Sequence, residues 1–172
     1  TIHDGVSGNL GNEFFMNCSS LAAVTLPEGI TTMGEIEMLD YQEQSNGDYY
    51  FRAYGTSIYS GAFKGCTSLT SIDLSNVKNI GAHAFEGCTS LTEVHFPDDM
   101  EELPATTFVD CTSLRSIELP PRLKFIEFQA FLRCSNLEEI HIPSSVGTIG
   151  FSALEGCTSL RRGELPRGLT KL

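Results

Sequence analysis

Six cysteines are the residues best suited to chemistry in this chain of 172 residues. Thiols can pair in disulfides, bind metal ions or act as nucleophiles. Five of them recur at intervals of 22 or 23 residues, each followed by Thr-Ser-Leu or Ser-Asn-Leu: Cys66, Cys88, Cys111, Cys134 and Cys157. A fixed interval in this range is typical of stacked repeats, so these cysteines mark equivalent positions in successive units.

A second set of residues follows the same interval and could bind a metal ion. Carboxylate and imidazole groups alternate along it, in the order Asp73, His95, Glu118, His141 and Glu164. Of these, His95, Glu118 and His141 are residue types that bind zinc. A tetrahedral zinc site needs ligands that converge on one point, whereas these residues are expected along a line. We therefore favour a ladder of alternating charges over a metal site.

The repeat unit explains how these residues are positioned. In the copy that spans residues 111–133, Ile117 and Leu119 predict a short strand that points both side chains inward and Glu118 outward. Pro120 follows at once, and because it has no N–H for a ladder it ends the strand. One unit has too few apolar groups to fold alone, so it becomes stable only when neighbouring units cover both of its sides.

This repeat position also gives the cysteines a structural interpretation. Equivalent positions in a parallel stack lie about 4.8 Å apart, a spacing that by itself would permit a disulfide. Cysteine is, however, also a small and usually buried apolar residue. We favour a column of buried thiols, which Cys18 would also join. The cysteine content therefore does not indicate the redox compartment.

The stretch from Ile80 to Leu91 reads Ile-Gly-Ala-His-Ala-Phe-Glu-Gly-Cys-Thr-Ser-Leu and resembles the signature of BspA-type leucine-rich repeats. The resemblance covers residues 60–172 closely and residues 10–34 well. It implies a mainly β repeat solenoid, a right-handed superhelix of about 23-residue coils with short parallel strands and little helix. It also implies an adhesion or binding protein that is secreted or located at the cell surface.

Charge and composition narrow the range of partners. The chain has 22 acidic and 11 basic residues and a net charge of −11, so nucleic acid is not an expected partner. It has no apolar stretch of about 18 residues, so insertion into a membrane is not expected either. Motifs of serine hydrolases, zinc proteases and phosphate-binding loops are missing from the sequence. We therefore expect neither catalysis nor a cofactor.

The regular spacing fails between Gly34 and Tyr59. This insertion, at about 35–58, is either a decayed repeat or a hairpin that turns at residues 45–47, because Asn-Gly suits a type I′ turn. We favour an intermediate arrangement in which the second strand joins the main sheet and the loop of residues 42–48 projects. Its tyrosines could form a contact surface or could cover an irregular core: Tyr41, Tyr49, Tyr50 and Tyr54.

The sequence thus predicts one solenoid domain over residues 1–172 that recognises other proteins without catalysis. The alternatives are a structural subunit of a larger assembly and a metal-binding surface protein. Both ends of the chain fall inside a repeat, which suggests a fragment or an assembly contact at the uncapped C-terminal end. The outward strand positions form the expected binding face: Asp73, Glu93, His95, Glu118, Glu139, His141, Arg162 and Glu164.

Overall fold

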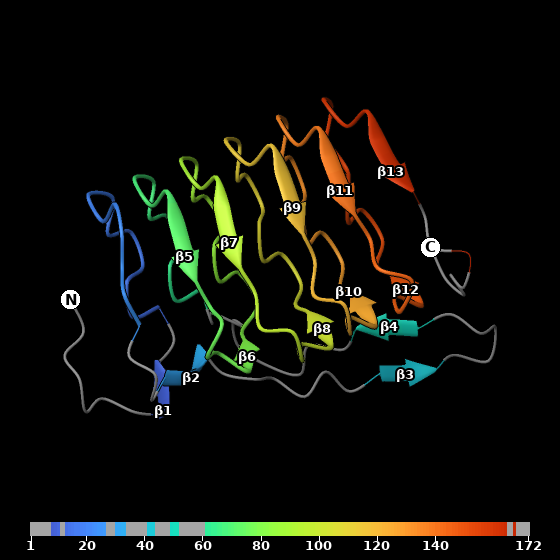
Figure 1. Ribbon diagram of the computed structural model, residues 1–172, viewed down its shortest axis with the longest axis horizontal. Helices are drawn as coiled ribbons and strands as arrows, with labels where there is room; N and C mark the ends of the chain where they lie inside the picture. The colour runs from blue at the N-terminus through green and yellow to red at the C-terminus, as the bar shows by residue number, and fades with distance from the viewer. Residues whose placement is uncertain are drawn as a thin grey trace.

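The solenoid is seen in a computed structural model that describes residues 8–10, 13–26, 30–33, 41–43, 49–51, 61–164 and 167. Thirteen short strands and the turns between them make up these residues, which include no helix and hence none that could cross a membrane. Successive coils stack side by side along the long axis (Figure 1). The predicted fold class, a mainly β repeat solenoid with short parallel strands, is confirmed.

The first strand row runs along one side of the stack (Figure 1). Each of its strands has three residues, and where side chains are described the central one faces the core. Neighbours are parallel and form two sheets, β5–β7 and β9–β11–β13. The strands are β5 (Ser71–Asp73), β7 (Glu93–His95), β9 (Ser116–Glu118), β11 (Glu139–His141) and β13 (Arg162–Glu164).

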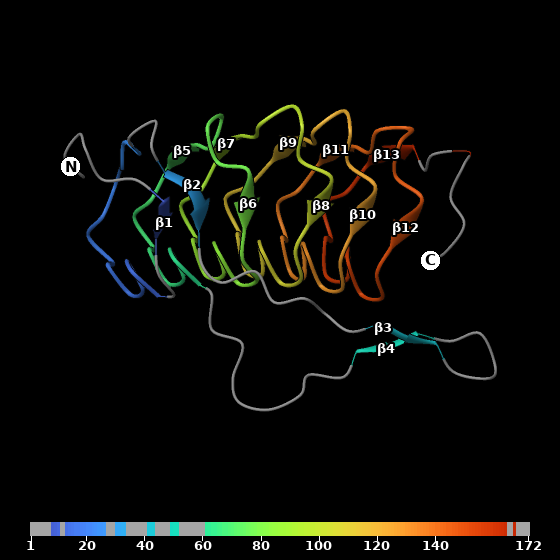
Figure 2. The ribbon, with the colours of Figure 1, turned by 90° about the horizontal axis from the view of Figure 1, so that it is seen from below.

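The second strand row follows later in each coil and is best seen in Figure 2. It also consists of parallel strands in two sheets, β1–β2–β6 and β8–β10–β12. The strands are β1 (Gly8–Leu10), β2 (Ile30–Met33), β6 (Asn79–Ile80), β8 (Glu102–Leu103), β10 (Phe125–Ile126) and β12 (Thr148–Ile149).

Both rows break at the coil that begins with Cys88. In the second row, the N–H groups of Gly81, Glu127 and Gly150 each donate a hydrogen bond to the preceding coil, at 2.7–3.0 Å. The equivalent residue in the Cys88 coil is Pro104, which has no N–H to donate. The described strands accordingly show no pairing between β6 and β8.

The break in the first row falls between β7 and β9, which no ladder joins among the described residues. The residue after β7 is Phe96, where neighbouring coils have Leu or Ile. Its ring packs edge-to-face on Phe108, with centroids 6.1 Å apart. The bulkier side chain thus marks the coil at which the row is interrupted.

The insertion forms a separate antiparallel pair of strands, β3 (Tyr41–Glu43) and β4 (Tyr49–Phe51). Our expectation that the second strand joins the main sheet is wrong for the described residues, because β4 pairs with β3 and with neither strand row. Adjacent antiparallel strands need only a short turn, whereas a parallel row needs a crossover. The expected turn at 45–47 lies outside the described residues.

The core contains a column of five stacked phenylalanine rings, which Leu154 follows at the same repeat position of the Cys134 coil. Successive centroids lie 5.1–5.6 Å apart and the ring planes differ by 8–16°. Offset stacking of this kind adds to the burial of apolar surface. The column comprises Phe15, Phe63, Phe85, Phe108 and Phe131.

A column of thiols lies beside the rings. The Sγ of Cys111 donates a hydrogen bond of 3.2 Å to the carbonyl oxygen of Phe85, the residue before Phe108 in the ring column. The four other repeat cysteines make equivalent bonds of 3.0–3.2 Å, from Cys66 to Phe15, Cys88 to Phe63, Cys134 to Phe108 and Cys157 to Phe131. All six cysteines are free thiols, as expected, although Cys18 is exposed and Cys157 is only partly buried. Burial raises the pKa of the Cys66 thiol to about 11 and that of Cys88 to about 12.

These raised pKa values predict a loss of stability at alkaline pH. Unfolded thiols lose their protons near the ordinary value of 9.0, whereas the folded thiols keep theirs to about 11 or higher. Above pH 9.0 the unfolded state therefore binds fewer protons, and the free energy of unfolding should fall as pH rises through this window. Urea denaturation below and above pH 9.0 measures how steeply the free energy of unfolding falls with pH. Cys88→Ser should make this fall less steep, because serine does not titrate in this range. An equal slope in this variant would contradict the assignment.

Candidate binding surface

The outward positions of the first strand row carry most of the residues expected at the binding face. Three-residue strands alternate outward, inward, outward, so the first and third side chains of β5, β7, β9 and β11 reach solvent. Arg162 and Glu164 take the matching backbone positions on β13. We call the exposed set the charged face: Asp73, Glu93, His95, Glu118, Glu139 and His141.

The register within each sheet matches the predicted alternation of acid and imidazole. Asp73 lies opposite His95 across β5 and β7. Glu118 lies opposite His141, which in turn lies opposite Glu164. Directly opposed residues on parallel neighbours are close enough for their charges to interact, so each sheet carries its own short charge ladder.

The ladder is not continuous, however, because the break between β7 and β9 separates His95 from Glu118. The three residues considered for a metal site, His95, Glu118 and His141, are therefore divided between two sheets. In the part of the chain that the structure describes, no three His, Cys, Asp or Glu residues form a group that could hold a metal ion.

The local contacts of the charged face show how its groups pair. His95 Nε2 lies 3.0 Å from Glu93 Oε1 on the same strand. Asp73 accepts a hydrogen bond of 2.9 Å from the backbone N–H of Ser75. This bond, with a second from the Ser75 side chain and the nearby charge of His95, lowers the pKa of the Asp73 carboxyl group. Carboxylates outnumber imidazoles by four to two on the charged face, which makes it acidic.

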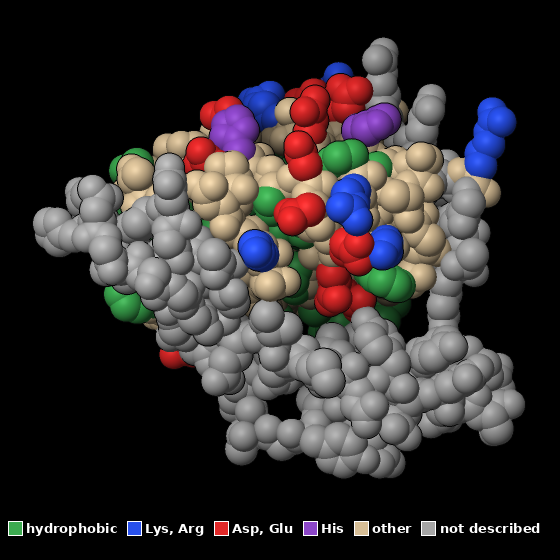
Figure 3. Space-filling view, turned by 60° about the horizontal axis from the view of Figure 1, so that its bottom comes forward, with side chains coloured by type: hydrophobic (Ala, Val, Ile, Leu, Met, Phe, Trp, Pro, Cys, Tyr) green, Lys and Arg blue, Asp and Glu red, His purple; other side chains and the backbone are tan. Residues whose placement is uncertain are grey.

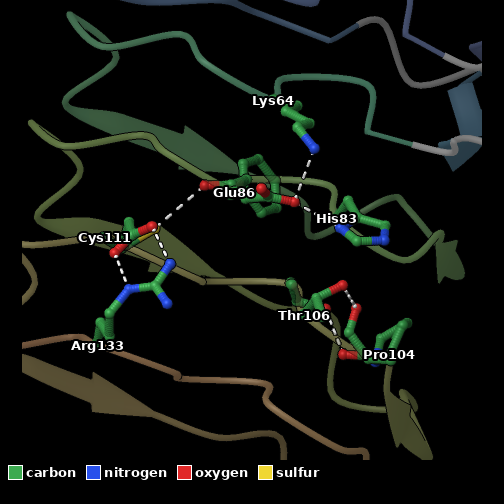
Figure 4. A network of polar contacts seen from close by, with 11 residues as sticks. Lys64, His83, Glu86, Pro104, Thr106, Cys111 and Arg133 are labelled. Carbon is green, nitrogen blue, oxygen red and sulfur yellow. Dashed lines mark hydrogen bonds and ion pairs between the residues drawn. The ribbon is translucent and has the colours of Figure 1, made fainter. Parts of the chain in front are cut away.

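A second set of charges lies along the turns, away from the charged face (Figure 4). Glu86 lies between Lys64, at 3.0 Å, and His83. In the next two coils Arg133 makes two hydrogen bonds to Asp110, at 2.6 and 2.7 Å, which lower the pKa of the Asp110 carboxyl group. Paired bonds of this kind fix the relative position of adjacent coils.

Asp110 and Arg133 also have a left-handed backbone conformation, which is unfavourable for residues other than glycine. Each residue immediately before a cysteine of the column has a positive φ, between 58° and 77°: Asn17, Gly65, Gly87, Asp110, Arg133 and Gly156. Glycine adopts this conformation at no steric cost, whereas Asp and Arg do so at some cost. Their mutual ion pair offsets part of that cost.

The sequence analysis did not predict these ion pairs between coils, although the repeat interval indicates them. Four ion pairs join residues 22 or 23 positions apart: Lys64–Glu86, Arg115–Glu138, Lys124–Glu101 and Arg133–Asp110. Opposite charges at one repeat interval therefore predict contacts between adjacent coils.

The tyrosines of the insertion are only partly placed. Tyr41, Tyr49 and Tyr50 lie on the β3–β4 hairpin, where Tyr41 pairs with Phe51 and Tyr50 with Gln42. Tyr54 lies outside the described residues. A contact role for these tyrosines stays a prediction.

Comparison with known proteins identifies the repeat. The model of the BspA type leucine rich repeat region matches in six copies, over residues 2–40 and 56–172, and leaves out the segment that contains the hairpin. No curated protein matches the chain.

Solved structures of bacterial leucine-rich repeat proteins are similar to the chain. One from Bacteroides ovatus is 30% identical with a TM-score of 0.78, covering 98% of this chain and 37% of that protein. One from T. pallidum is 35% identical with a TM-score of 0.59, covering 64% and 58%. A leucine rich cell surface protein from Faecalibacterium prausnitzii is 28% identical with a TM-score of 0.57, covering 93% and 57%.

The chain thus spans less than two thirds of the length of each of these proteins. The family model, by contrast, matches most of the chain. The protein belongs to the BspA-type leucine-rich repeat family.

Proposed function

We propose that this protein is a non-catalytic recognition module that binds a partner protein through the charged face, outside the cell or at its surface. The observation that carries the proposal is the row of exposed carboxylate and imidazole side chains held in register by β5–β7 and β9–β11. Leucine-rich repeat proteins generally mediate protein–protein interaction, and the similar protein from F. prausnitzii is called a cell surface protein.

The spacing and charge of the face define the partner that it suits. Its described part has four carboxylates and two imidazoles, on strands about 4.8 Å apart within each sheet. Because strands fix these groups, the face loses little conformational freedom on binding. A basic surface on the partner would complement it, and such attraction weakens as salt increases.

Reversing one charge on this face is expected to separate binding from folding. Glu118→Lys should change the free energy of unfolding by less than about 0.5 kcal/mol, because Glu118 is exposed. It should nevertheless weaken partner binding, because it places a positive charge opposite the partner's basic groups. The matched control is Glu155→Lys, an exposed charge reversal on a turn.

The test is affinity capture of extracellular proteins by the parent chain and by both variants, with quantification by mass spectrometry. We expect at least one protein that the parent and Glu155→Lys retain and that Glu118→Lys loses. If every retained protein binds all three chains equally, the charged face is not the binding surface.

A further inference from the structure

Two exposed phenylalanine rings and a third, half-buried ring, that of Phe128, lie in two adjacent coils, outside the core. Phe125 on β10 is 42% exposed, and its register neighbours on β8 and β12 are Glu102 and Thr148, both polar. In the same two coils, Phe128 and Phe151 replace the alanine that two earlier coils have at this position. We call Phe125, Phe128 and Phe151 the aromatic patch.

The rings of the aromatic patch are not needed to fill the solenoid. The position of the ring column is filled by the fully buried Phe131 in the first of these coils and by the partly buried Leu154 in the second, whereas Phe151 is 61% exposed. Phe128 and Phe151 stack on each other with centroids 5.4 Å apart and planes 11° from parallel. The stack therefore presents apolar surface to solvent that burial against another molecule would stabilise.

A carboxylate without a basic partner borders the aromatic patch. Glu102 lies directly opposite Phe125 in the ladder between β8 and β10. Partial loss of hydration and the nearby carboxylate of Glu127 both raise the pKa of the Glu102 side chain. No Lys or Arg among the described residues makes an ion pair with Glu102, since nearby Lys124 and Arg122 pair with Glu101, at 2.7 and 3.5 Å.

We propose that the aromatic patch and Glu102 bind a segment of a partner protein in which an arginine or lysine stands next to apolar residues. A guanidinium or ammonium group can lie against a phenylalanine face and also pair with a carboxylate, and the apolar neighbours would cover the Phe128–Phe151 stack. Figure 3 shows acidic and basic side chains intermixed on the face viewed, with hydrophobic side chains exposed between them.

Charge complementarity favours a basic protein segment over nucleic acid or anionic lipid. The chain has a net charge of −11, so nucleic acid and anionic lipid would be repelled, whereas a basic segment would be attracted. The site uses residues of the second strand row, and the charged face of the first row takes no part in it. A test of binding at the aromatic patch is therefore independent of a test of binding at the charged face.

The test is selection of random linear peptides on the immobilised parent chain, followed by binding to variants. The double variant Phe125→Ser/Phe151→Ser removes the two most exposed rings of the patch, and Phe14→Ser is the matched control, because Phe14 is 58% exposed in a distant coil. Circular dichroism and thermal melting of each variant show whether it keeps the parent fold.

We expect selected peptides that bind the parent and Phe14→Ser at least about tenfold more tightly than the double variant. Each should contain Arg or Lys next to an apolar residue, and Glu102→Gln should weaken its binding about fivefold or more. The proposal fails if no selected peptide depends on the patch, or if patch-dependent peptides lack Arg and Lys. It also fails if sedimentation shows that the patch joins two copies of this chain.

Discussion

Phe108→Ala is expected to destabilise the protein more than any other single truncation in the ring column, by about 3–5 kcal/mol in the free energy of unfolding. Its ring is fully buried and stacks on Phe85 and Phe131 in the two neighbouring coils, at 5.5 and 5.4 Å. It also meets the ring of Phe96 edge-on. Removing it leaves a cavity that adjoins three rings, and coils held by hydrogen bonds on both sides have little freedom to close it.

Chemical denaturation measures this effect, with Phe151→Ala as the matched control. Phe151 undergoes the same chemical change at a side chain that is 61% exposed and that stacks on a single described ring. Its loss should therefore cost less than about 1 kcal/mol. Equal destabilisation by the two variants would show that the ring column does not carry the packing we assign to it.

Gly150→Ala is expected to cost about 2–3 kcal/mol, because the added methyl group has no space. An added Cβ would lie 2.4 Å from the backbone nitrogen of Phe128 and 2.7 Å from the carbonyl carbon of Glu127. The Gly150 N–H donates a hydrogen bond of 2.7 Å to Ile126, which holds the strands at this distance. Relief of the clash must therefore move the backbone of two coils.

The control for this variant is Gly87→Ala, which adds a methyl group at a residue with a left-handed backbone conformation but causes no steric clash. Gly87 has a φ of 73°, but an added Cβ would meet its nearest atom at 3.7 Å, an ordinary contact distance. Only the left-handed conformation opposes the substitution, at about 1–2 kcal/mol. If urea denaturation shows that Gly150→Ala costs less than Gly87→Ala, the close approach of the two coils is not a constraint.

Much of the fold follows from the sequence because one coil predicts its neighbours. Alternation within a three-residue strand places Ile117 inside and Glu118 outside, and the repeat interval carries that assignment to every other coil. The thiol column is also predictable. Its hydrogen bond is not, since Cys111 reaches Phe85 over 26 residues, an offset that differs from the repeat interval.

The interruptions could not be predicted from the average repeat, because they depend on departures from it. Pro104 is visible in the sequence, but its effect depends on knowing that this position donates a hydrogen bond to the preceding coil. The break beside Phe96 depends on how a larger ring packs in one coil only. The break between β7 and β9 divides the charged face, which sequence reasoning treated as one continuous ladder.

The hairpin shows a different limit. The Asn46-Gly47 pair indicated a turn, and local turn chemistry is readable from sequence. Whether the second strand then joins a sheet far along the chain depends on packing between distant segments. Short-range residue preferences do not encode such packing.

The positions of the two interruptions bear on how cooperatively the array unfolds. The first row breaks on the C-terminal side of the Cys88 coil, between β7 and β9, and the second row breaks on its N-terminal side, between β6 and β8. The Cys88 coil therefore stays joined to the preceding coil by β5–β7 and to the following coil by β8–β10. Because the breaks are staggered, neither side of this coil offers a plane along which the solenoid could separate into two independently melting blocks.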